Sequence, residues 1–547
     1  MFVMIIFDTD YYGMEGRLKW FLKNLSHAKA NNWMVITHEH LGRHYKKYAM
    51  GCAERFYNEF EMRRLDSKEY EEIRKGFVPD AIFEEIEKRF VSRTEALLFL
   101  FEKRVLQLED CLIQMIDNEL KNSPGERVEG IFNCLDCYKS IHYLGEHYGC
   151  PVIPYSFSAI RKMHGYRQTL YFADLSGCMR SSQSAEQSCR NYLKSECFFP
   201  IFSRRELLAL FGKDKNLPLL RLLDAKPKYE VGICKTPNSI YPYDFLKFKY
   251  TDVDVYYEAK QFFEEDSIVI RDHPNIPWNG SDKGFRKEHQ RNDPISFLLS
   301  CERIVSVNSQ ILLKALLWNR AVCLKGDLSS FGFMCNKDIK ETKRADIDAL
   351  NYYIFGYLIP AELMFDAEYW KWRINKKVSE YDIYRKHFEY YLKYFDLEEG
   401  IIYNNNETER FRYILMKRGC CGSLIDKLVR NQAPENFDYE VLYSKLTADS
   451  DSALEVLQIF SLNKSEEGKI SSVFEVRNED CLKCLYFYPF ADVGGFADIR
   501  SITINDEKTD VNEGFVYFDK TDGKRVFEIR LPAGKHRIFL EWEYYFK

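Results

Sequence analysis

Short apolar runs alternate with helical patterns through the first part of the chain. These runs cover residues 1–7, 33–37, 129–133 and 152–155. Continuous apolar runs of this length are typical of strands that are buried in a parallel sheet. Because strands that alternate with helices build such sheets, the pattern predicts an α/β lobe over residues 1–225. Within it, residues 67–121 have apolar positions at three- and four-residue spacing, which predicts a helical insertion that covers the sheet.

A second α/β lobe is predicted over residues 226–345. Its apolar runs cover residues 229–234, 267–270, 303–307 and 321–324, with helical patterns near 252–264 and 310–318. The last two runs and the helix between them form a compact strand, helix, strand unit. Residues 176–225 are helical in pattern, and we interpret them as the link between the two lobes.

The end of the chain changes character twice. Residues 346–465 are rich in aromatic residues and mainly helical, and we expect them to pack across both lobes. Residues 466–547 contain short apolar runs separated by turns rich in Gly, Asn and Asp, which predict an all-β sandwich. The predicted fold class is therefore α/β, with two Rossmann-like lobes, helical insertions and an accessory β-sandwich.

Composition indicates an ordinary globular protein of several domains. The chain has 547 residues, of which 46% are hydrophobic and 29% charged. A net charge of -5 argues against a surface that binds nucleic acid. No apolar run has the length of a membrane span, and the first apolar run is too short for a signal peptide. We therefore interpret the 16 cysteines as reduced thiols of a cytoplasmic protein.

Two patterns suggest a metal site at first sight. Cys134 and Cys137 have C-x-x-C spacing, as do Cys481 and Cys484, but the first pair follows a predicted strand and the second lies within one. The histidine cluster at residues 38–44 begins His-Glu-His and lacks the H-E-x-x-H spacing of helical zinc ligands. We predict no metal site and interpret the histidines as polar lining of a cleft.

Asp8 and Asp10 directly follow the first predicted strand, where α/β sheets bind ligands. Three interpretations remain open. The pair resembles the metal-binding D-x-D motif of one large fold class of glycosyltransferases. That motif normally follows a complete nucleotide-binding half, whereas here only seven residues precede Asp8. The pair also resembles the nucleophile motif of haloacid-dehalogenase-type phosphatases, although Tyr11, Tyr12 and Gly13 depart from that motif. The third interpretation is a turn with a helix cap.

The stretch from 266 to 326 contains the best candidate for an anion site. Asn308 and Ser309 end a predicted strand, and a helical pattern begins at Gln310. A helix start presents unpaired N–H groups to an anion, and the hydroxyl of Ser309 would add a donor. The alternative is that Ser309 serves only as the N-cap.

Neighbouring strand ends offer further phosphate ligands. His273 precedes Pro274, which restricts it to an extended backbone at the tip of the predicted strand 267–270, and Arg271 directly follows the same strand. Lys235 follows the first strand of the second lobe and offers a cation to a phosphate or a sugar. These residues complete the predicted nucleotide site.

The order of these features is a strand followed by His-Pro and then a strand followed by Asn-Ser and a helix. This order resembles that of the nucleotide-binding half of bacterial GT-B glycosyltransferases that use CMP-activated acidic sugars. These are the Kdo transferases of capsule and lipopolysaccharide synthesis and, more distantly, the bacterial sialyltransferases. In this group a His-Pro loop and a Ser-bearing loop hold the CMP phosphate. The resemblance therefore implies that His273 and Ser309 hold it here.

A second segment resembles the same family in outline. Its members carry approximately E-x-G-x-x-R, an aromatic residue and T-x-Y-F-D, and here Arg161 and residues 168–174 match. Ser156 stands where the family has an acidic residue, so the catalytic acid must be sought elsewhere. The candidate carboxylates are Asp8, Asp10, Glu39 and Asp136.

The resemblance implies transfer of an acidic sugar such as Kdo from CMP-Kdo to a capsular polysaccharide or lipopolysaccharide acceptor. The resemblance also implies that the reaction needs no cofactor and no metal and that the second substrate is a glycan or a glycolipid. It implies a cytoplasmic protein located at the inner face of the plasma membrane. The alternatives are a GT-B transferase that uses a UDP- or GDP-sugar, a phosphatase built on Asp8 and Asp10, and a non-catalytic glycan-binding protein.

Overall fold

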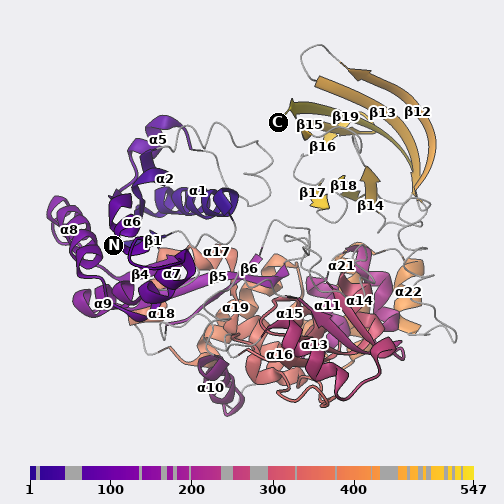
Figure 1. Cartoon of the computed structure of the whole chain (residues 1–547). Coiled ribbons are helices and arrows are strands. Elements are labelled where there is room, and N and C mark those ends of the chain that lie inside the picture. The colour runs from indigo at the N-terminus through magenta and orange to yellow at the C-terminus, as the bar shows by residue number, and fades with distance from the viewer. Residues whose placement is uncertain are drawn as a thin grey trace.

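The structure is a computed structural model of the chain. It describes residues 1–7, 13–43, 65–134, 138–161, 169–175, 182–195, 199–212, 214–235, 251–271, 294–326, 329–375, 378–420, 422–430, 454–464, 469–478, 484–487, 495–509, 515–519, 524–530 and 534–546. Figure 1 shows two α/β regions and a group of strands near the C-terminus. The predicted α/β class is confirmed, with two sheets that are mainly parallel.

Seven strands form the sheet of the N-terminal lobe, in the order β11-β6-β5-β4-β1-β2-β3. Their bounds are β1 (Phe2–Ile6), β2 (Met34–His38), β3 (Lys75–Val78), β4 (Gly130–Cys134), β5 (Val152–Arg161), β6 (Thr169–Ala173) and β11 (Ile359–Pro360). Strands β1 to β5 pair in parallel, whereas β6 is antiparallel to both of its neighbours. The chain places β2 and β3 on one side of β1 and then β4 and β5 on the other. The strand order therefore reverses between β1 and β4.

Helices cover both faces of this sheet. They are α1 (Gly13–Asn31), α2 (Glu39–Arg43), α5 (Ser67–Glu71), α6 (Asp80–Glu87), α7 (Arg93–Glu102), α8 (Leu106–Asn122) and α9 (Lys139–Tyr148). One face packs Met4 and Trp33 against Trp370 from late in the chain. The other packs Ile5 against Leu112 of α8. Burial on both faces explains why the strands are continuous apolar runs.

The segment predicted as a wholly helical insertion contains a strand. Within residues 67–121, β3 pairs in parallel with β2 and alternates between half-buried and buried positions. Its four residues are too few to interrupt a helical pattern in the sequence. Because the pairing partner is distant in the chain, tertiary contacts decide the strand, and local propensity could not show it.

The sheet of the second lobe has four parallel strands in the order β10-β9-β7-β8. They are β7 (Tyr229–Cys234), β8 (Ile268–Arg271), β9 (Cys301–Ser306) and β10 (Ala321–Leu324), accompanied by α13 (Asp252–Lys260), the 3₁₀ turn η3 (Glu265–Ser267), α14 (Pro294–Ser300) and α15 (Ile311–Leu317). The chain runs from β7 outward to β8 and then crosses to β9 on the other side. The strand order of this sheet reverses between β7 and β9.

The connecting and returning segments are mainly helical. They are α10 (Ser182–Leu193), α11 (Arg204–Phe211), η2 (Asp214–Leu222), η4 (Gly332–Met334), α16 (Ile347–Tyr352), the π-helix η5 (Tyr353–Tyr357), α17 (Ala361–Met364), α18 (Ala367–Asn375), α19 (Glu380–Tyr394), α20 (Glu399–Ile402), α21 (Glu407–Lys417) and α22 (Gly422–Arg430). Immediately after η5 the chain joins the first sheet as β11, and Trp370 of α18 then packs on that sheet.

One cluster of buried hydrophobic residues contains side chains from both lobes. Ile160 of β5 and Leu170 and Phe172 of β6 belong to the same buried cluster as Leu312 and Leu316 of α15. The hairpin of β5 and β6 therefore extends the first sheet into contact with the second lobe. This packing brings the carboxyl end of β5 near α15.

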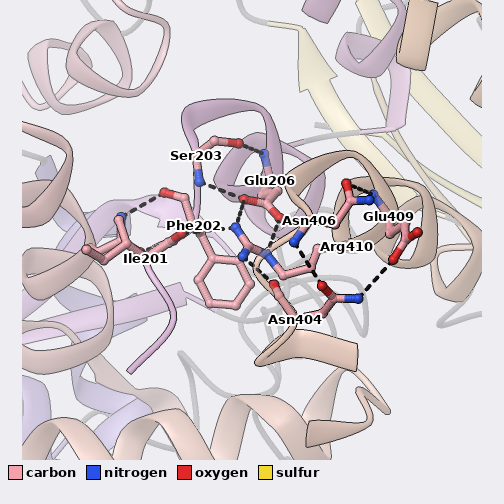
Figure 2. A network of polar contacts seen from close by, with 9 residues as sticks. Ile201, Phe202, Ser203, Glu206, Asn404, Asn406, Glu409 and Arg410 are labelled. Atoms are coloured by element: carbon pink, nitrogen blue, oxygen red, sulfur yellow. Dashed lines mark hydrogen bonds and ion pairs between the residues drawn. The ribbon is translucent and has the colours of Figure 1, made fainter. Parts of the chain in front are cut away.

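A buried polar network joins the linker to the returning helices. Arg410 of α21 donates from Nε to Glu206 Oε1 at 2.8 Å and from Nη2 to Glu206 Oε2 at 3.1 Å. The same guanidinium donates to the carbonyl oxygens of Asn404 and Ile201. Figure 2 shows these contacts together with Ser203, which caps α11 and pairs reciprocally with Glu206.

The described residues after residue 453 form two groups of strands, and the predicted β-sandwich stays a prediction. One sheet has the order β12-β13-β19-β15-β16 and the other β14-β18-β17. The strands are β12 (Leu454–Lys464), β13 (Lys469–Asn478), β14 (Cys484–Phe487), β15 (Gly495–Ile504), β16 (Glu507–Thr509), β17 (Phe515–Asp519), β18 (Lys524–Arg530) and β19 (Gly534–Phe546). The prediction missed β12, which lies before the expected boundary at residue 466.

Candidate functional site

The strand-order reversal of the second lobe lies between the carboxyl ends of β7 and β9. Ser306, the last residue of β9, donates from its hydroxyl to the carbonyl oxygen of Cys234, the last residue of β7, at 2.6 Å. Lys235 follows β7 and Asn308 follows β9, so both lie at the edge where open α/β sheets bind ligands. These are two of the residues predicted for the nucleotide site.

Lys235 and Arg271 lie on adjacent strand ends. The N–H of Lys235 donates to the carbonyl oxygen of Arg271 at 3.0 Å, which fixes the two residues side by side. Both residues are buried, and the Arg271 guanidinium lies 6.0 Å from the ring centroid of Phe297. Two cationic side chains thus start from one corner of the sheet edge.

The loop after β9 is held by the loop after β10. The Asn308 amide oxygen accepts a hydrogen bond of 2.7 Å from Ser329, and the N–H of Gly326 donates to Val307 at 2.8 Å. A Cβ at Gly326 would lie 2.6 Å from the Val307 carbonyl oxygen, so only glycine permits this approach. The backbone that presents Ser309 is therefore fixed from a second strand end.

The start of α15 differs in detail from the prediction. The helix begins at Ile311 and its N-cap is Gln310, so Ser309 is not the capping residue. The first turn is of 3₁₀ type, because the N–H groups of Leu312 and Leu313 donate to carbonyl oxygens three residues earlier. Ser309 is half-buried, and the side-chain oxygen of Gln310 is buried without a hydrogen-bond partner among the described residues.

Several predicted site residues lie outside the described residues. They are Asp8, Asp10, Asp136, His273 and Pro274. In sequence, Asp8 follows β1 and Asp136 follows β4, and the described ends of these two strands flank the strand-order reversal of the first lobe. The assignment of the three aspartates to the acceptor side stays a prediction.

The histidine segment lies at the carboxyl end of β2. His38 ends the strand and Glu39 begins α2. Nδ1 of His38 lies 3.6 Å from Oδ1 of Asp80, the first residue of α6. The nearby His38 imidazole is the main cause that lowers the pKa of the Asp80 carboxyl below its ordinary value, against a smaller opposing effect of burial. Sequence reasoning identified the histidines but missed Asp80, which lies in the segment taken as wholly helical.

The segment that resembles the family motif spans the end of β5 and all of β6. Arg161 is the last residue of β5 and pairs with Thr169 of β6, and Ser156 is buried within β5. Asp174, which follows β6, accepts hydrogen bonds from Tyr357 at 3.1 Å and from Ser184 at 3.2 Å. The motif thus lies where the first lobe meets the rest of the chain.

The π-helix η5 provides contacts that sequence reasoning missed. The Tyr353 hydroxyl lies 2.6 Å from that of Ser330 in the loop after β10, and its ring stacks on that of Tyr357 at 5.2 Å. Tyr357 in turn donates to Asp174. The π-helix therefore links the loop beside Asn308 to the end of β6. Its one sequence signal is the run of tyrosines within the segment predicted to be aromatic-rich and helical.

Two absences hold for the described part of the chain. No group of three or more His, Cys, Asp or Glu side chains there is arranged to hold a metal ion. Among the helices described, none has both the length and the apolar character to cross a membrane.

No protein-family model matches the sequence, and no curated protein matches it. Similar solved structures include two KpsC enzymes of Thermosulfurimonas dismutans. The β-Kdo 2,4 transferase is 14% identical with a TM-score of 0.28, and the match covers 42% of this chain and 81% of that one. The β-Kdo 2,7 transferase is 13% identical with a TM-score of 0.29, covering 48% and 90%.

A UDP-GlcNAc 2-epimerase of Methanocaldococcus jannaschii, in complex with UDP-GlcNAc and UDP, is also similar. It is 9% identical with a TM-score of 0.24, and the match covers 61% of this chain and 86% of that one. At such identities and TM-scores these similarities carry no inference about activity or site residues. The sugar donor and the acceptor stay predictions.

Proposed function

We propose that this protein is a GT-B glycosyltransferase that transfers an acidic sugar, such as Kdo from CMP-Kdo, to a bacterial surface glycan. The observation that carries the proposal is the strand order of the two α/β sheets. Each order reverses once, and open α/β sheets bind ligands outside the carboxyl ends at such reversals. One chain thus offers two sites, as a donor and an acceptor require.

The second lobe is the donor side of the proposal. In the proposal, Ser309, Lys235 and His273 supply a hydroxyl, an ammonium and an imidazole to the phosphate of CMP, and Arg271 and Gln310 are further contacts. The departing phosphate gains negative charge in the transition state, and donors fixed around it lower the barrier electrostatically. The contacts of Asn308 with Ser329 and of Gly326 with Val307 keep this loop preorganised.

The first lobe is the acceptor side. Transfer to a glycan hydroxyl requires a group that accepts its proton, or a nucleophile if configuration is retained. The candidate carboxylates are Asp8, Asp10 and Asp136, which follow the two strands next to the reversal in sequence, and Glu39, which follows β2, the neighbour of β1. Arg161 at the end of β5 is the cation proposed to face the acidic sugar. The choice of Kdo and of a capsular or lipopolysaccharide acceptor rests on the resemblance of the motifs.

Thermal unfolding with nucleotides tests the donor site. CMP at about 100 times its Kd should add about 2.7 kcal/mol to the free energy of unfolding, because it binds only the folded chain. Removal of one hydrogen bond to a charged phosphate by Ser309→Ala should weaken CMP binding roughly 10- to 100-fold. Titration calorimetry with CMP measures this change.

A matched control is available at the opposite edge of the same sheet. Ser267 precedes β8 and bonds to Glu230 and Glu264, so Ser267→Ala should leave CMP affinity unchanged. Stabilisation by UDP or GDP in place of CMP would favour a different nucleotide sugar. Magnesium-dependent phosphate ester hydrolysis lost in Asp8→Asn would favour the phosphatase. If no nucleotide binds, the proposal is wrong.

A further inference from the structure

A histidine and an aspartate meet at the carboxyl edge of the first sheet, apart from the carboxylates considered above. Nδ1 of His38 at the end of β2 lies 3.6 Å from Oδ1 of Asp80 at the start of α6. β2 pairs directly with β1, so the two residues lie one strand away from the reversal between β1 and β4. Two segments that are distant in sequence thus place an imidazole and a carboxylate together on the acceptor side.

Aromatic side chains fix the His38 ring. Its centroid lies 4.2 Å from that of Phe83 and 5.4 Å from that of Phe7, and the Phe7 ring stacks on Tyr138 at 5.8 Å. Phe7 ends the described part of the first strand region, and Tyr138 precedes α9. The His38 side chain keeps 13% of its surface exposed, so the ring is held without being sealed from solvent.

The electrostatics favour one tautomer of this ring. The His38 ring and the backbone of His40 lie near the Asp80 carboxyl, and both stabilise its charged form and lower its pKa. An ionised carboxylate beside Nδ1 favours a proton on that nitrogen. Nε2 then carries the lone pair, which is the arrangement of a general base oriented by a carboxylate.

Resting on the proposed function, we propose that His38 is the general base of the transfer and that Asp80 is its positioning residue. Nε2 takes the proton of the acceptor hydroxyl while the hydroxyl oxygen bonds to the anomeric carbon of the sugar. The bond from that carbon to the phosphate oxygen breaks, and its electron pair leaves with CMP. Asp80 stabilises the imidazolium until the proton passes to solvent.

Turnover with water as the acceptor tests this role without knowledge of the glycan. The probe is CMP-Kdo, and enzyme-dependent release of CMP is measured above the spontaneous rate. His38→Ala should lower kcat roughly 100- to 10,000-fold, the range of general base catalysis, with CMP affinity unchanged. Added imidazole should restore part of the rate, because it can occupy the space that the His38 ring leaves beside Phe7 and Phe83. A purely structural role would not respond to imidazole.

Two further variants complete the test. Asp80→Asn should lower kcat less than His38→Ala and leave the KM for CMP-Kdo unchanged. His147 is exposed near the end of α9, so the control variant His147→Ala should leave turnover unchanged. Full activity of a folded His38→Ala variant would overturn the proposed roles of His38 and Asp80, and so would a loss of activity that imidazole does not reverse. If the same variant still bound CMP, the proposed donor site would stand. A wild-type chain that binds no CMP would overturn both proposals.

Discussion

His387 is a fully buried side chain with a contact at each of its ring nitrogens. Its Nε2 lies 2.8 Å from the hydroxyl of Tyr369 and its Nδ1 lies 3.0 Å from the carbonyl oxygen of Phe355. Burial, with a smaller effect of the nearby Arg373 cation, lowers its pKa from 6.5 to about 3. The native chain therefore holds a neutral imidazole that joins α18, α19 and the π-helix.

This side chain should make stability depend on pH below neutrality. Its folded pKa is depressed, so its full contribution is present above pH 6.5 and is lost as pH falls toward 3. The loss is about 1.4 kcal/mol per pH unit, or about 2 kcal/mol between neutrality and pH 5. Urea unfolding followed by tryptophan fluorescence should show a smaller pH dependence for His387→Gln than for wild type. Equal pH dependence of the two chains would contradict the assignment.

The exposed histidine of α9 provides the control for that measurement. His147→Gln also removes one imidazole, and it should leave the pH dependence as in wild type, because its side chain lies on the surface. The comparison separates the effect of burial from that of a lost histidine.

Single residues at strand ends were predictable from sequence, whereas their partners were not. Lys235 and Asn308 follow apolar runs, and parallel strands end at one edge, so their placement followed from the pattern. The pairing of His38 with Asp80 depends on β3, which no local pattern revealed. The N-cap at Gln310 instead of Ser309 reflects a first turn of 3₁₀ type, a difference of one residue that sequence does not resolve.

Helices α11 and α21 are joined by an ion pair with little access to water. The side chain of Glu206 is fully buried and that of Arg410 is 9% exposed. Figure 2 shows the contacts between them. Both partners have additional hydrogen bonds, so neither charge depends on the other alone. The main effect of such a pair on stability is the free-energy cost of removing one partner, because the other charge is then left buried and unpaired.

Arg410→Met should therefore destabilise the chain by about 3–5 kcal/mol, because it leaves the Glu206 carboxylate buried without its cation. The double variant Glu206→Met with Arg410→Met should be more stable than this single variant. Urea unfolding midpoints of wild type, of Arg410→Met, of Glu206→Met and of the double variant form a double-mutant cycle. A double variant less stable than Arg410→Met would contradict the explanation.

The same helix carries a matched exposed pair. Arg412 of α21 lies 3.0 Å from Asp426 of α22, with side chains 45% and 50% exposed. Arg412→Met should change stability by less than about 1 kcal/mol, because solvent screens such pairs. The contrast tests whether burial, and not the count of ion pairs, holds the helices together.

Whether an element could be predicted depended on how local its causes are. Helices α5, α11, α13 and α19 begin with capping boxes, a signal confined to four residues. The strand β3 and the π-helix η5 have no such signal. The first depends on pairing with β2, and the second differs from an α-helix only in hydrogen-bond spacing.

In the molecule as a whole, β6 belongs to two cores at once. Leu170 and Phe172 face the cluster shared with α15, whereas Tyr171 packs on Phe365 at 5.3 Å in the core of the first lobe. Alternation along one strand thus ties the two lobes together. Sequence predicted two lobes with a link, but not that a strand of the first lobe is itself part of the contact.

Leu170→Ala should therefore loosen both lobes. The cavity should cost about 2–5 kcal/mol, and amide hydrogen exchange should rise in β4 of the first lobe and in β9 of the second. Leu112→Ala removes an equally buried leucine of α8 from a core that belongs to the first lobe alone, so exchange in β9 should stay at the wild-type rate. Mass spectrometry of the exchanged peptides distinguishes the two variants. If Leu170→Ala raised exchange in one lobe only, the lobes would unfold independently, and a shared core would not explain how the proposed donor and acceptor sites keep their relative position.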